Sequence, residues 1–247
     1  MHVTTNALVL RGVDYKESDK ILTLLTQELG KLTASARGCR KKGSALATGC
    51  QLLCWSQVVL YDYGGRWSVK EAATLREFQG VRAGLDKLAL ACYFAEVTEL
   101  LAVEGLPSPE LLSLLLNSLH ALDRMDKPLP LVKAAFEGKS MCLAGYEPAL
   151  ESCAACGAEQ PESPRFYLQE GELRCAACLE AQGPFLPLDA SALAALRHIV
   201  YGNPKRLFSF RAEGESLLLL AGLTEAYLQV QLEREFQTLD FYKQVRQ

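Results

Sequence analysis

Two Cys-x2-Cys pairs carry the clearest chemistry in this sequence, Cys153 with Cys156 and Cys175 with Cys178. The letters "CAAC" occur twice, with 18 residues between the pairs, and Gly157 follows the first pair. Each pair can bring two thiolates to one side of a tight turn, and four thiolates complete the tetrahedral shell of a structural zinc ion. We therefore predict one structural Zn²⁺ per chain, with a redox dithiol or a chance pairing as the alternatives. A closed four-sulfur shell leaves no position for a substrate, so this metal is expected to support the fold.

The second chemical signal is the basic, glycine-flanked segment "ARGCRKKGS" at residues 36–44. Five Lys and Arg residues and no acidic residue lie from Lys31 to Lys42, in a chain whose net charge is -3. A solvated surface turn is one interpretation, and a phosphate-binding loop is the other. Residues 1–80 hold 11 Lys and Arg against 7 Asp and Glu, whereas residues 81–247 hold 15 against 22. This asymmetry favours a nucleic-acid contact confined to the first third of the chain.

The sequence does not predict a catalytic site. It contains three histidines and no H-E-x-x-H, G-x-S-x-G or G-x-G-x-x-G motif. The segment "GCRKKGS" has two glycines at P-loop spacing, but it lacks the lysine that a P-loop places between Gly43 and Ser44. Without that charge, ATP hydrolysis is not expected. We therefore predict that the protein is not an enzyme; a zinc hydrolase, which needs an open coordination position, is the catalytic alternative.

The composition is that of a globular protein, with 49% hydrophobic and 22% charged residues. The N-terminus lacks the basic start and long apolar core of a signal peptide. The longest apolar run, "LLLLAGL" at 217–223, is too short to cross a bilayer. We expect a cytoplasmic, nucleoid-associated protein without a membrane partner, in which cysteines bind metal or stay reduced. The cysteines outside the two pairs fit no ligand spacing and are expected to be buried or inert thiols: Cys39, Cys50, Cys54, Cys92 and Cys142.

The first 80 residues have the pattern of β structure. Strands are expected at residues 6–10, 20–27, 31–37, 51–63 and 66–72, with a hairpin turn at Gly64-Gly65. In "KLTASAR" (31–37), polar and apolar residues alternate as in a half-buried strand. Five short strands within about 75 residues predict a small closed barrel, and the OB-fold is such a barrel with an oligonucleotide-binding face.

These strands would place aromatic rings beside the basic segment. Trp55, Tyr61, Tyr63 and Trp67 could stack on bases. At least half of them are expected to belong instead to the barrel core or to its junction with the helices, and Tyr63 and Trp67, next to the Gly-Gly turn, are the better candidates for exposure. No element has the pattern of a major-groove recognition helix, so we expect DNA binding with little sequence preference. The predicted DNA-binding residues are Lys31, Arg37, Arg40, Lys41, Lys42, Arg66, Trp67 and Lys70.

From residue 81 onward the pattern becomes helical. Helices are expected at 84–105, 107–125, 129–145 and 189–202, followed by one or two closing helices within 215–245. The cysteine pairs interrupt this pattern, and the residues between them read as a hairpin that turns at Glu170-Gly171. The predicted fold class is α+β and multidomain. An OB-fold barrel over residues 1–80 precedes an all-α domain over residues 81–247, with a four-cysteine zinc module inserted at about residues 146–186.

The expected helical domain is acidic and should pack and dock proteins rather than bind DNA. One small basic cluster, Lys205, Arg206 and Arg211, is either a solvated loop or an auxiliary DNA contact.

Three segments resemble the bacterial recombination mediator family RecO, and they occur in the family's order. "VDYKESDKILTLLTQELGKLTASARGCRKKGS" (13–44) is similar to the N-terminal signature, with a Tyr-x-Glu-x-Asp segment, a strand, Gly-Lys and a basic loop. "GYEPALESCAACG" (145–157) and "EGELRCAAC" (170–178) resemble the zinc-bearing stretch of those members that have one. "LTEAYLQVQLEREFQTLDF" (223–241) is similar to the closing helix. The resemblance covers nearly the whole chain.

This resemblance implies a DNA-repair protein without known enzymatic turnover, built from an OB domain and a helical domain. RecO-like proteins bind single- and double-stranded DNA and anneal complementary strands. With the partner RecR they help RecA load onto DNA coated by single-strand binding protein.

The chain departs from the family pattern at one place. Family members commonly carry a basic pair late in the final helix, where this chain has Gln237 and Thr238. A binding patch for the acidic tail of single-strand binding protein is therefore not carried over to this chain. The alternative function is a zinc-ribbon nucleic-acid-binding factor of transcription or translation. Such a factor would place its basic residues on the zinc knuckle, whereas this knuckle region is mostly acidic.

Overall fold

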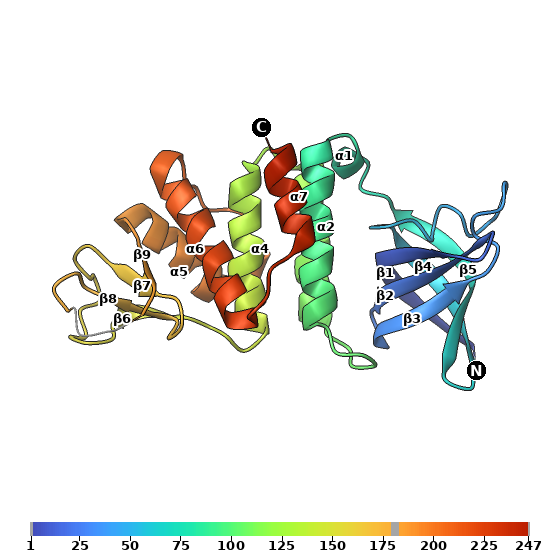
Figure 1. Ribbon diagram of the computed structural model, residues 1–247, viewed down its shortest axis with the longest axis horizontal. Coiled ribbons are helices and arrows are strands. Elements are labelled where there is room, and N and C mark those ends of the chain that lie inside the picture. Colours follow the sequence, from blue (N-terminus) through green and yellow to red (C-terminus); the bar gives the residue numbers. More distant parts are fainter. Residues whose placement is uncertain (1, 179–182, 247) are drawn as a thin grey trace. The chain divides into compact units, whose positions relative to one another are not determined.

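The computed structural model describes residues 2–178 and 183–246 (Figure 1). The chain forms two compact units. Unit 1 comprises Met1–Met125 with Phe236–Gln247, and unit 2 comprises Asp126–Glu235. None of the helices in the described residues combines the length and apolar character that crossing a bilayer requires.

Unit 1 contains a five-stranded closed barrel (Figure 1). The strands are β1 (His2–Tyr15), β2 (Asp19–Thr26), β3 (Gly30–Ala36), β4 (Trp55–Tyr63) and β5 (Arg66–Arg76), in the spatial order β1-β2-β3-β5-β4. β3 and β5 pair in parallel, and the other neighbouring strands are antiparallel. This confirms the predicted OB-like barrel. Gly64 and Gly65 form the β4–β5 turn with φ values of 59° and 80°, which glycine adopts without strain.

The barrel core follows the alternation seen in the sequence. In β3, Leu32, Ala34 and Ala36 are buried, while the intervening side chains are exposed or half-buried. β4 begins at Trp55 rather than at residue 51, because Leu53 adopts a left-handed φ of 60° and donates its N–H to the Val9 carbonyl. Residues 37–54 therefore form a long connection of turns, and the basic segment is its first part.

Three of the cysteines outside the two pairs are buried in or beside the barrel: Cys39, Cys50 and Cys54. Burial, helped by the neighbouring thiols, raises the pKa of Cys50 to about 12. Burial also raises the pKa of Cys92, and it raises the pKa of Cys142 in unit 2 to about 11. Thiols with raised pKa values stay protonated near neutral pH, as the expected inert role requires.

Four helices complete the described part of unit 1: α1 (Gln79–Arg82), α2 (Leu85–Leu101), α3 (Pro109–Arg124) and α7 (Gln237–Val245). Helix α2 contacts β1 and α7, and Arg11 of β1 makes a bidentate ion pair with Glu99 of α2 at 2.8 Å. Arg82 of α1 donates to the Leu52 carbonyl of the barrel connection. These contacts place α1 and α2 in the same compact unit as the barrel, and the domain boundary expected at residue 80 stays a prediction.

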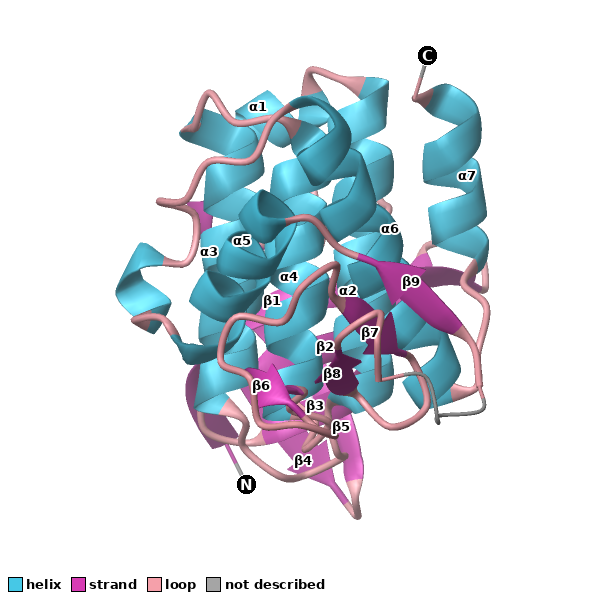
Figure 2. Ribbon diagram, turned by 90° about the vertical axis from the view of Figure 1, so that its left-hand side faces the viewer, coloured by secondary structure: helices cyan, strands magenta, loops and turns pink. Residues whose placement is uncertain are grey.

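Unit 2, in its described residues, joins helices to a small four-stranded sheet of short strands (Figure 2). The elements are α4 (Leu129–Leu143), β6 (Ala149–Cys153), β7 (Arg165–Tyr167), β8 (Glu172–Arg174), β9 (Phe185–Pro187), α5 (Ala190–Tyr201), η1 (Pro204–Arg206) and α6 (Gly214–Leu232). The strand order is β6-β8-β7-β9. The predicted hairpin is confirmed, since β7 and β8 pair antiparallel and Gly171 has a φ of 67°. The closing helical segment breaks at Glu233, whose φ of 49° ends α6.

Candidate nucleic-acid interface and metal centre

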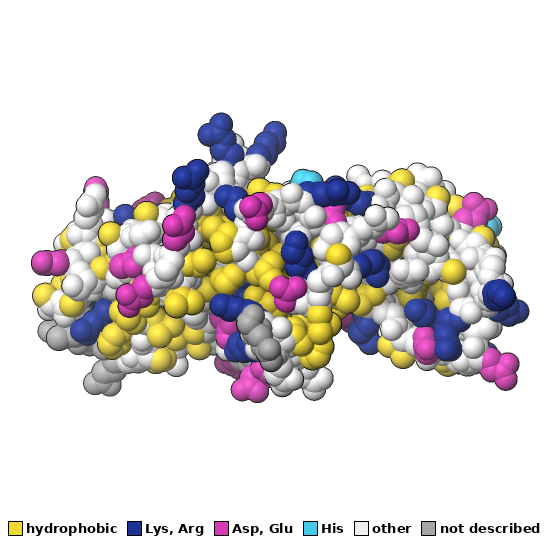
Figure 3. Space-filling model, turned by 90° about the horizontal axis from the view of Figure 1, so that it is seen from above, with side chains coloured by type: hydrophobic (Ala, Val, Ile, Leu, Met, Phe, Trp, Pro, Cys, Tyr) yellow, Lys and Arg dark blue, Asp and Glu magenta, His cyan; other side chains and the backbone are white. Residues whose placement is uncertain are grey.

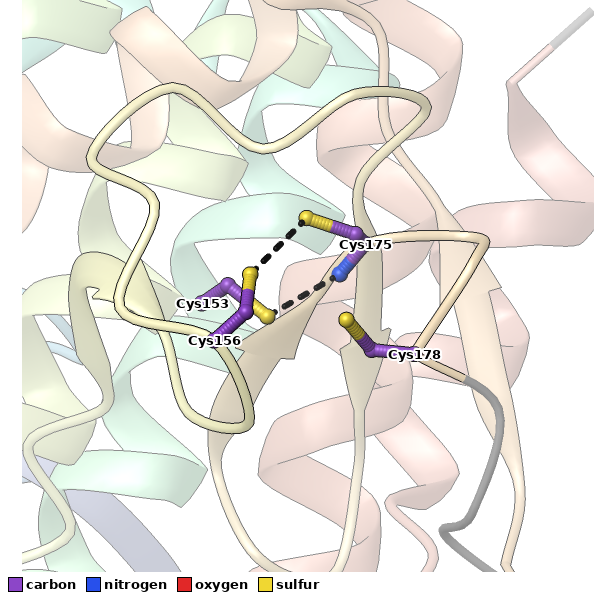
Figure 4. Close-up of side chains that lie close together, drawn as sticks. All are labelled: Cys153, Cys156, Cys175 and Cys178. Carbon is purple, nitrogen blue, oxygen red and sulfur yellow. Dashed lines mark hydrogen bonds between the residues drawn. The ribbon is translucent and has the colours of Figure 1, made fainter.

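The four cysteines of the two pairs converge at one end of the small sheet (Figure 4). Their sulfur atoms all lie within 4.8 Å of one another, and Sγ of Cys156 is 3.8 Å from Sγ of Cys175. Cys153 and Cys175 are buried, whereas Cys156 is exposed. The sequence prediction that the two pairs meet is confirmed.

Local backbone structure explains this convergence. Cys153 ends β6 and lies beside Leu173 of β8, so each Cys-x2-Cys pair begins at the end of one of two neighbouring parallel strands. Each pair then closes a tight turn. Gly157 donates its N–H to the Cys153 carbonyl, and Cys178 donates to the Cys175 carbonyl. Gly157 has a φ of 74°, which the turn requires and which residues other than glycine rarely adopt.

The donor set favours a soft metal ion. Burial disfavours a thiolate at Cys153, but N–H groups of Cys156, Cys175 and Ala155 outweigh it and lower the pKa of Cys153 to about 6. A hydrogen bond with Cys156, together with burial, raises the pKa of Cys178 to about 12. One sulfur is therefore already disposed to be a thiolate, and a cation among the four would favour the charged form of the others. These cysteines could bind a metal ion through four sulfur ligands.

Side chains of α5 and α6 hold the cysteine-bearing loops in place. Arg197 donates to the carbonyls of Leu150, Glu151 and Glu159, at 2.8, 3.0 and 2.7 Å, on either side of the first cysteine pair. Gln231 donates to the backbone carbonyls of residues 168 and 169 in the hairpin between the pairs. Side chains of two helices of unit 2 thus support the candidate metal centre.

The second candidate site is a groove of about 840 Å³ on the barrel of unit 1. It brings together cations and aromatic rings from β1, β4 and β5, from the β1–β2 turn and from the residue that follows β3. Its lining residues are Tyr15, Lys16, Asp19, Ile21, Thr33, Ser35, Arg37, Tyr61, Tyr63, Gly65, Arg66, Trp67, Ser68, Lys70 and Glu104. We call this surface the barrel groove.

Four of the predicted DNA-binding residues line the barrel groove: Arg37, Arg66, Trp67 and Lys70. Trp67 is half-buried and packs against the barrel core, so only part of its ring faces the groove. Tyr63 is 76% exposed, as expected for a residue beside the Gly-Gly turn. Lys70 lies over the Tyr61 ring, 5.4 Å from its centroid. Cations that bind phosphate and rings that stack on bases are therefore adjacent in this groove.

The other four predicted residues do not line the barrel groove. Lys31 donates through Nζ to the Glu99 carbonyl in the last turn of α2, at 2.7 Å. Arg40 forms an ion pair with Asp14 at 3.1 Å and is directed toward the Glu17 carbonyl. Lys41 and Lys42 are exposed on the turn-rich connection. A DNA contact by these four residues stays a prediction.

Sequence reasoning missed two groove residues, Tyr15 and Lys16, at the β1–β2 turn. Tyr15 is 49% exposed and Lys16 lies over its ring, 5.3 Å from the centroid. The signal in the sequence was the adjacent "YK" at the end of a strand, but a single such pair is common. Only the closure of the barrel brings this turn beside β3 and β5.

The positive character of the groove is local. It holds four cations against the acidic residues Asp19 and Glu104, and the Asp19 carboxylate is engaged by the Gly38 N–H at 2.7 Å. On the face of the molecule in Figure 3, Lys and Arg side chains are interspersed with Asp and Glu, so no field of one sign covers that face. A polyanion would therefore be attracted by close contacts rather than by the net charge of the protein.

Comparisons with known proteins cover both halves of the chain. The family described as Recombination protein O N terminal matches residues 1–78, and the family described as Recombination protein O C terminal matches residues 82–240. The protein named DNA repair protein RecO from Acetivibrio thermocellus is 32% identical over 98% of this chain and 96% of its own length. The proteins of the same name from Desulforudis audaxviator and from an Anaeromyxobacter species are 32% and 36% identical; they cover 98% and 81% of this chain, and 96% and 80% of their own lengths. These matches span nearly all of the sequence, and the chain therefore belongs to the RecO family of DNA repair proteins.

Proposed function

We propose that this chain is a non-enzymatic DNA-binding recombination mediator. It binds single- and double-stranded DNA with little sequence preference and anneals complementary strands. With RecR it assists the loading of RecA onto DNA coated by single-strand binding protein, at the nucleoid. Membership of the RecO family supports the place in DNA repair, and the barrel groove is the observation that carries the DNA-binding part.

The groove offers both contacts that an unpaired strand needs. Lys16, Arg37, Arg66 and Lys70 supply positive charge along the groove, which suits a phosphate backbone that carries one charge per nucleotide. The rings beside them suit bases that are free to stack. Neither kind of contact identifies a base by a unique hydrogen-bond pattern, which supports weak sequence preference.

We propose zinc as the metal of the four-cysteine centre. Four sulfur ligands within 4.8 Å of one another, at Cys-x2-Cys spacing, fit a tetrahedral Zn²⁺ ion. When bound, the ion supplies structural cross-linking, because all four coordination positions are filled by the chain. Cys153, Cys156, Cys175 and Cys178 would hold it, and Arg197 orients the loops that carry the first two.

The partners RecR, RecA and single-strand binding protein are proposed from family membership. Gln237 and Thr238, where the chain departs from the family pattern, lie at the start of α7 rather than late in a helix. Thr238 donates from its N–H and its hydroxyl to the Glu96 carboxylate. An acidic peptide would meet that carboxylate at this place, so we do not assign a tail site to it.

A fluorescence-anisotropy titration of the full chain with single-stranded DNA over a salt series tests the DNA-binding proposal. Each cation that neutralises a phosphate on a single strand adds about 0.7 to the slope of log affinity against log salt. Replacing both Arg37 and Arg66 with Ala should therefore reduce the slope by about 1.4. The matched control replaces the exposed cations Arg234 and Arg246, which lie outside the barrel groove, with Ala and should leave the slope unchanged.

The basic segment is tested in the same titration with Arg40→Ala and Lys41→Ala combined. If both residues touch the backbone, the slope again falls by about 1.4. A slope that is unchanged in the groove variant would refute the assignment of the groove.

A further inference from the structure

The barrel groove contains one acidic side chain that the barrel itself does not supply. Glu104 belongs to the loop 103–106 that follows α2. Its backbone bridges to Lys31 of β3 in parallel fashion, and Gly105 donates its N–H to the Lys31 carbonyl at 2.9 Å. The loop is therefore hydrogen-bonded to β3 at this one point, and Glu104 lines the groove.

Close packing fixes the position of this loop. A Cβ atom added at Gly30 would lie 2.2 Å from the carbonyl oxygen of Leu106, so the backbones of β3 and the loop are in direct contact. The Lys31 side chain also holds the end of α2, through its bond to the Glu99 carbonyl. Glu104 is thus presented to the groove by a backbone with little freedom to move away.

The Glu104 carboxylate differs from the other acidic group of the groove. The Asp19 carboxylate accepts the Gly38 N–H and so has an internal role. Within residues 2–178 and 183–246, Glu104 has no hydrogen bond or ion pair through its side chain, and it is exposed. A carboxylate at the wall of a groove that binds a polyanion repels the phosphates. An ionised carboxylate can only accept hydrogen bonds, so the part of a DNA strand that it can bind is a donor group on a base.

We infer that Glu104 is a specificity-determining residue of the barrel groove and accepts a hydrogen bond from the exocyclic amino group of a stacked base. Cytosine and adenine, like guanine, carry such a donor, whereas thymine has a carbonyl oxygen at the position of the cytosine amino group. The N3–H of thymine lies between two carbonyl oxygens, which repel a carboxylate that approaches it. The inference rests on the proposed DNA-binding function of the same groove.

This preference is small compared with total affinity, which comes from phosphate contacts and stacking. One hydrogen bond to a charged acceptor, partly exposed to water, corresponds to a preference of about fivefold. Such a factor is compatible with a protein that binds many sequences, and it still gives amino-bearing strands an advantage over thymine runs.

The test compares oligodeoxycytidine and oligothymidine of equal length as anisotropy probes for the full chain at neutral pH. The wild type should bind the cytidine strand about fivefold more tightly. Glu104→Ala should bring the ratio of the two affinities close to one, mainly by strengthening thymidine binding. Glu104→Gln keeps an acceptor oxygen but removes the charge, so it should retain part of the preference. Glu71→Gln is the matched control, because it removes the same charge from an exposed position of β5 outside the groove.

The outcomes separate this inference from the function on which it rests. A wild type that binds both strands equally, or a Glu104→Ala variant that strengthens both by the same factor, would overturn the role of Glu104 and leave the DNA-binding proposal intact. A wild type that binds neither strand would refute both. Normal thermal unfolding of Glu104→Ala, expected because the bridge to Lys31 uses backbone atoms, shows that the comparison is made on folded protein.

Discussion

The Lys31 side chain could either stabilise the fold or contact DNA, and one substitution separates the two roles. Replacing Lys31 with Met keeps the aliphatic stem and removes the ammonium group that binds the Glu99 carbonyl at 2.7 Å. That carbonyl lies in the last turn of α2, where carbonyl groups lack partners within the helix and a cation is favoured by the helix dipole. A hydrogen bond from a charged donor, discounted for partial exposure to water, makes Lys31→Met destabilising by about 1–2 kcal/mol.

Two measurements on the same variant test this reasoning. Thermal unfolding should shift down by about 2–8 °C, given about 2–4 °C per kcal/mol for a chain of this size. If the ammonium group serves only to hold the end of α2, the salt slope for single-stranded DNA should not change. Lys70→Met is the matched control, since Lys70 is exposed in the barrel groove; it should lower the slope by about 0.7 and leave stability nearly unchanged. If Lys31→Met lowers the slope by that amount without destabilising the protein, Lys31 is a DNA contact and the structural interpretation is wrong.

Two further predictions concern unit 2. Cys175→Ser should reduce bound zinc to less than about half an equivalent and increase hydrogen exchange in the cysteine-bearing loops, because structural zinc contributes on the order of 10 kcal/mol to folding. DNA affinity should persist in that variant, and a large loss of DNA binding would contradict the division of roles between the two sites. Asp189 caps α5 by accepting the Ala192 N–H and the Ser216 hydroxyl; these bonds lower its pKa. Its contribution is therefore present above the pKa of the unfolded chain and is lost as pH falls through the lower folded value, so Asp189→Ala should destabilise by about 1 kcal/mol near neutral pH and by less in acid. Urea unfolding at several pH values measures this difference, and a penalty that grows toward acid pH would contradict it.

Features that depend on the spacing of neighbouring residues could be predicted before the fold was known. Alternation in residues 31–37 fixed which side chains of β3 face the barrel core, because successive side chains of a strand point to opposite faces. The two Cys-x2-Cys pairs, each with its own tight turn, were sufficient to predict that the four sulfur atoms meet. The Gly-Gly turn and the hairpin at Glu170-Gly171 could likewise be predicted, since tight turns need positive φ angles that favour glycine.

Which surface residues lie together depends on how distant segments pack, and it could not be predicted from spacing. Lys31 and Arg37 belong to the same polar face in the sequence pattern, yet one ends at the last turn of α2 and the other in the barrel groove. Tyr15 and Glu104 reach that groove from the β1–β2 turn and from the loop after α2. Periodicity tells which face of a strand a residue occupies, but not which distant segment packs against that face. Closure of the barrel and the packing of α2 on β1 set those neighbours, and through them they set the composition of the groove.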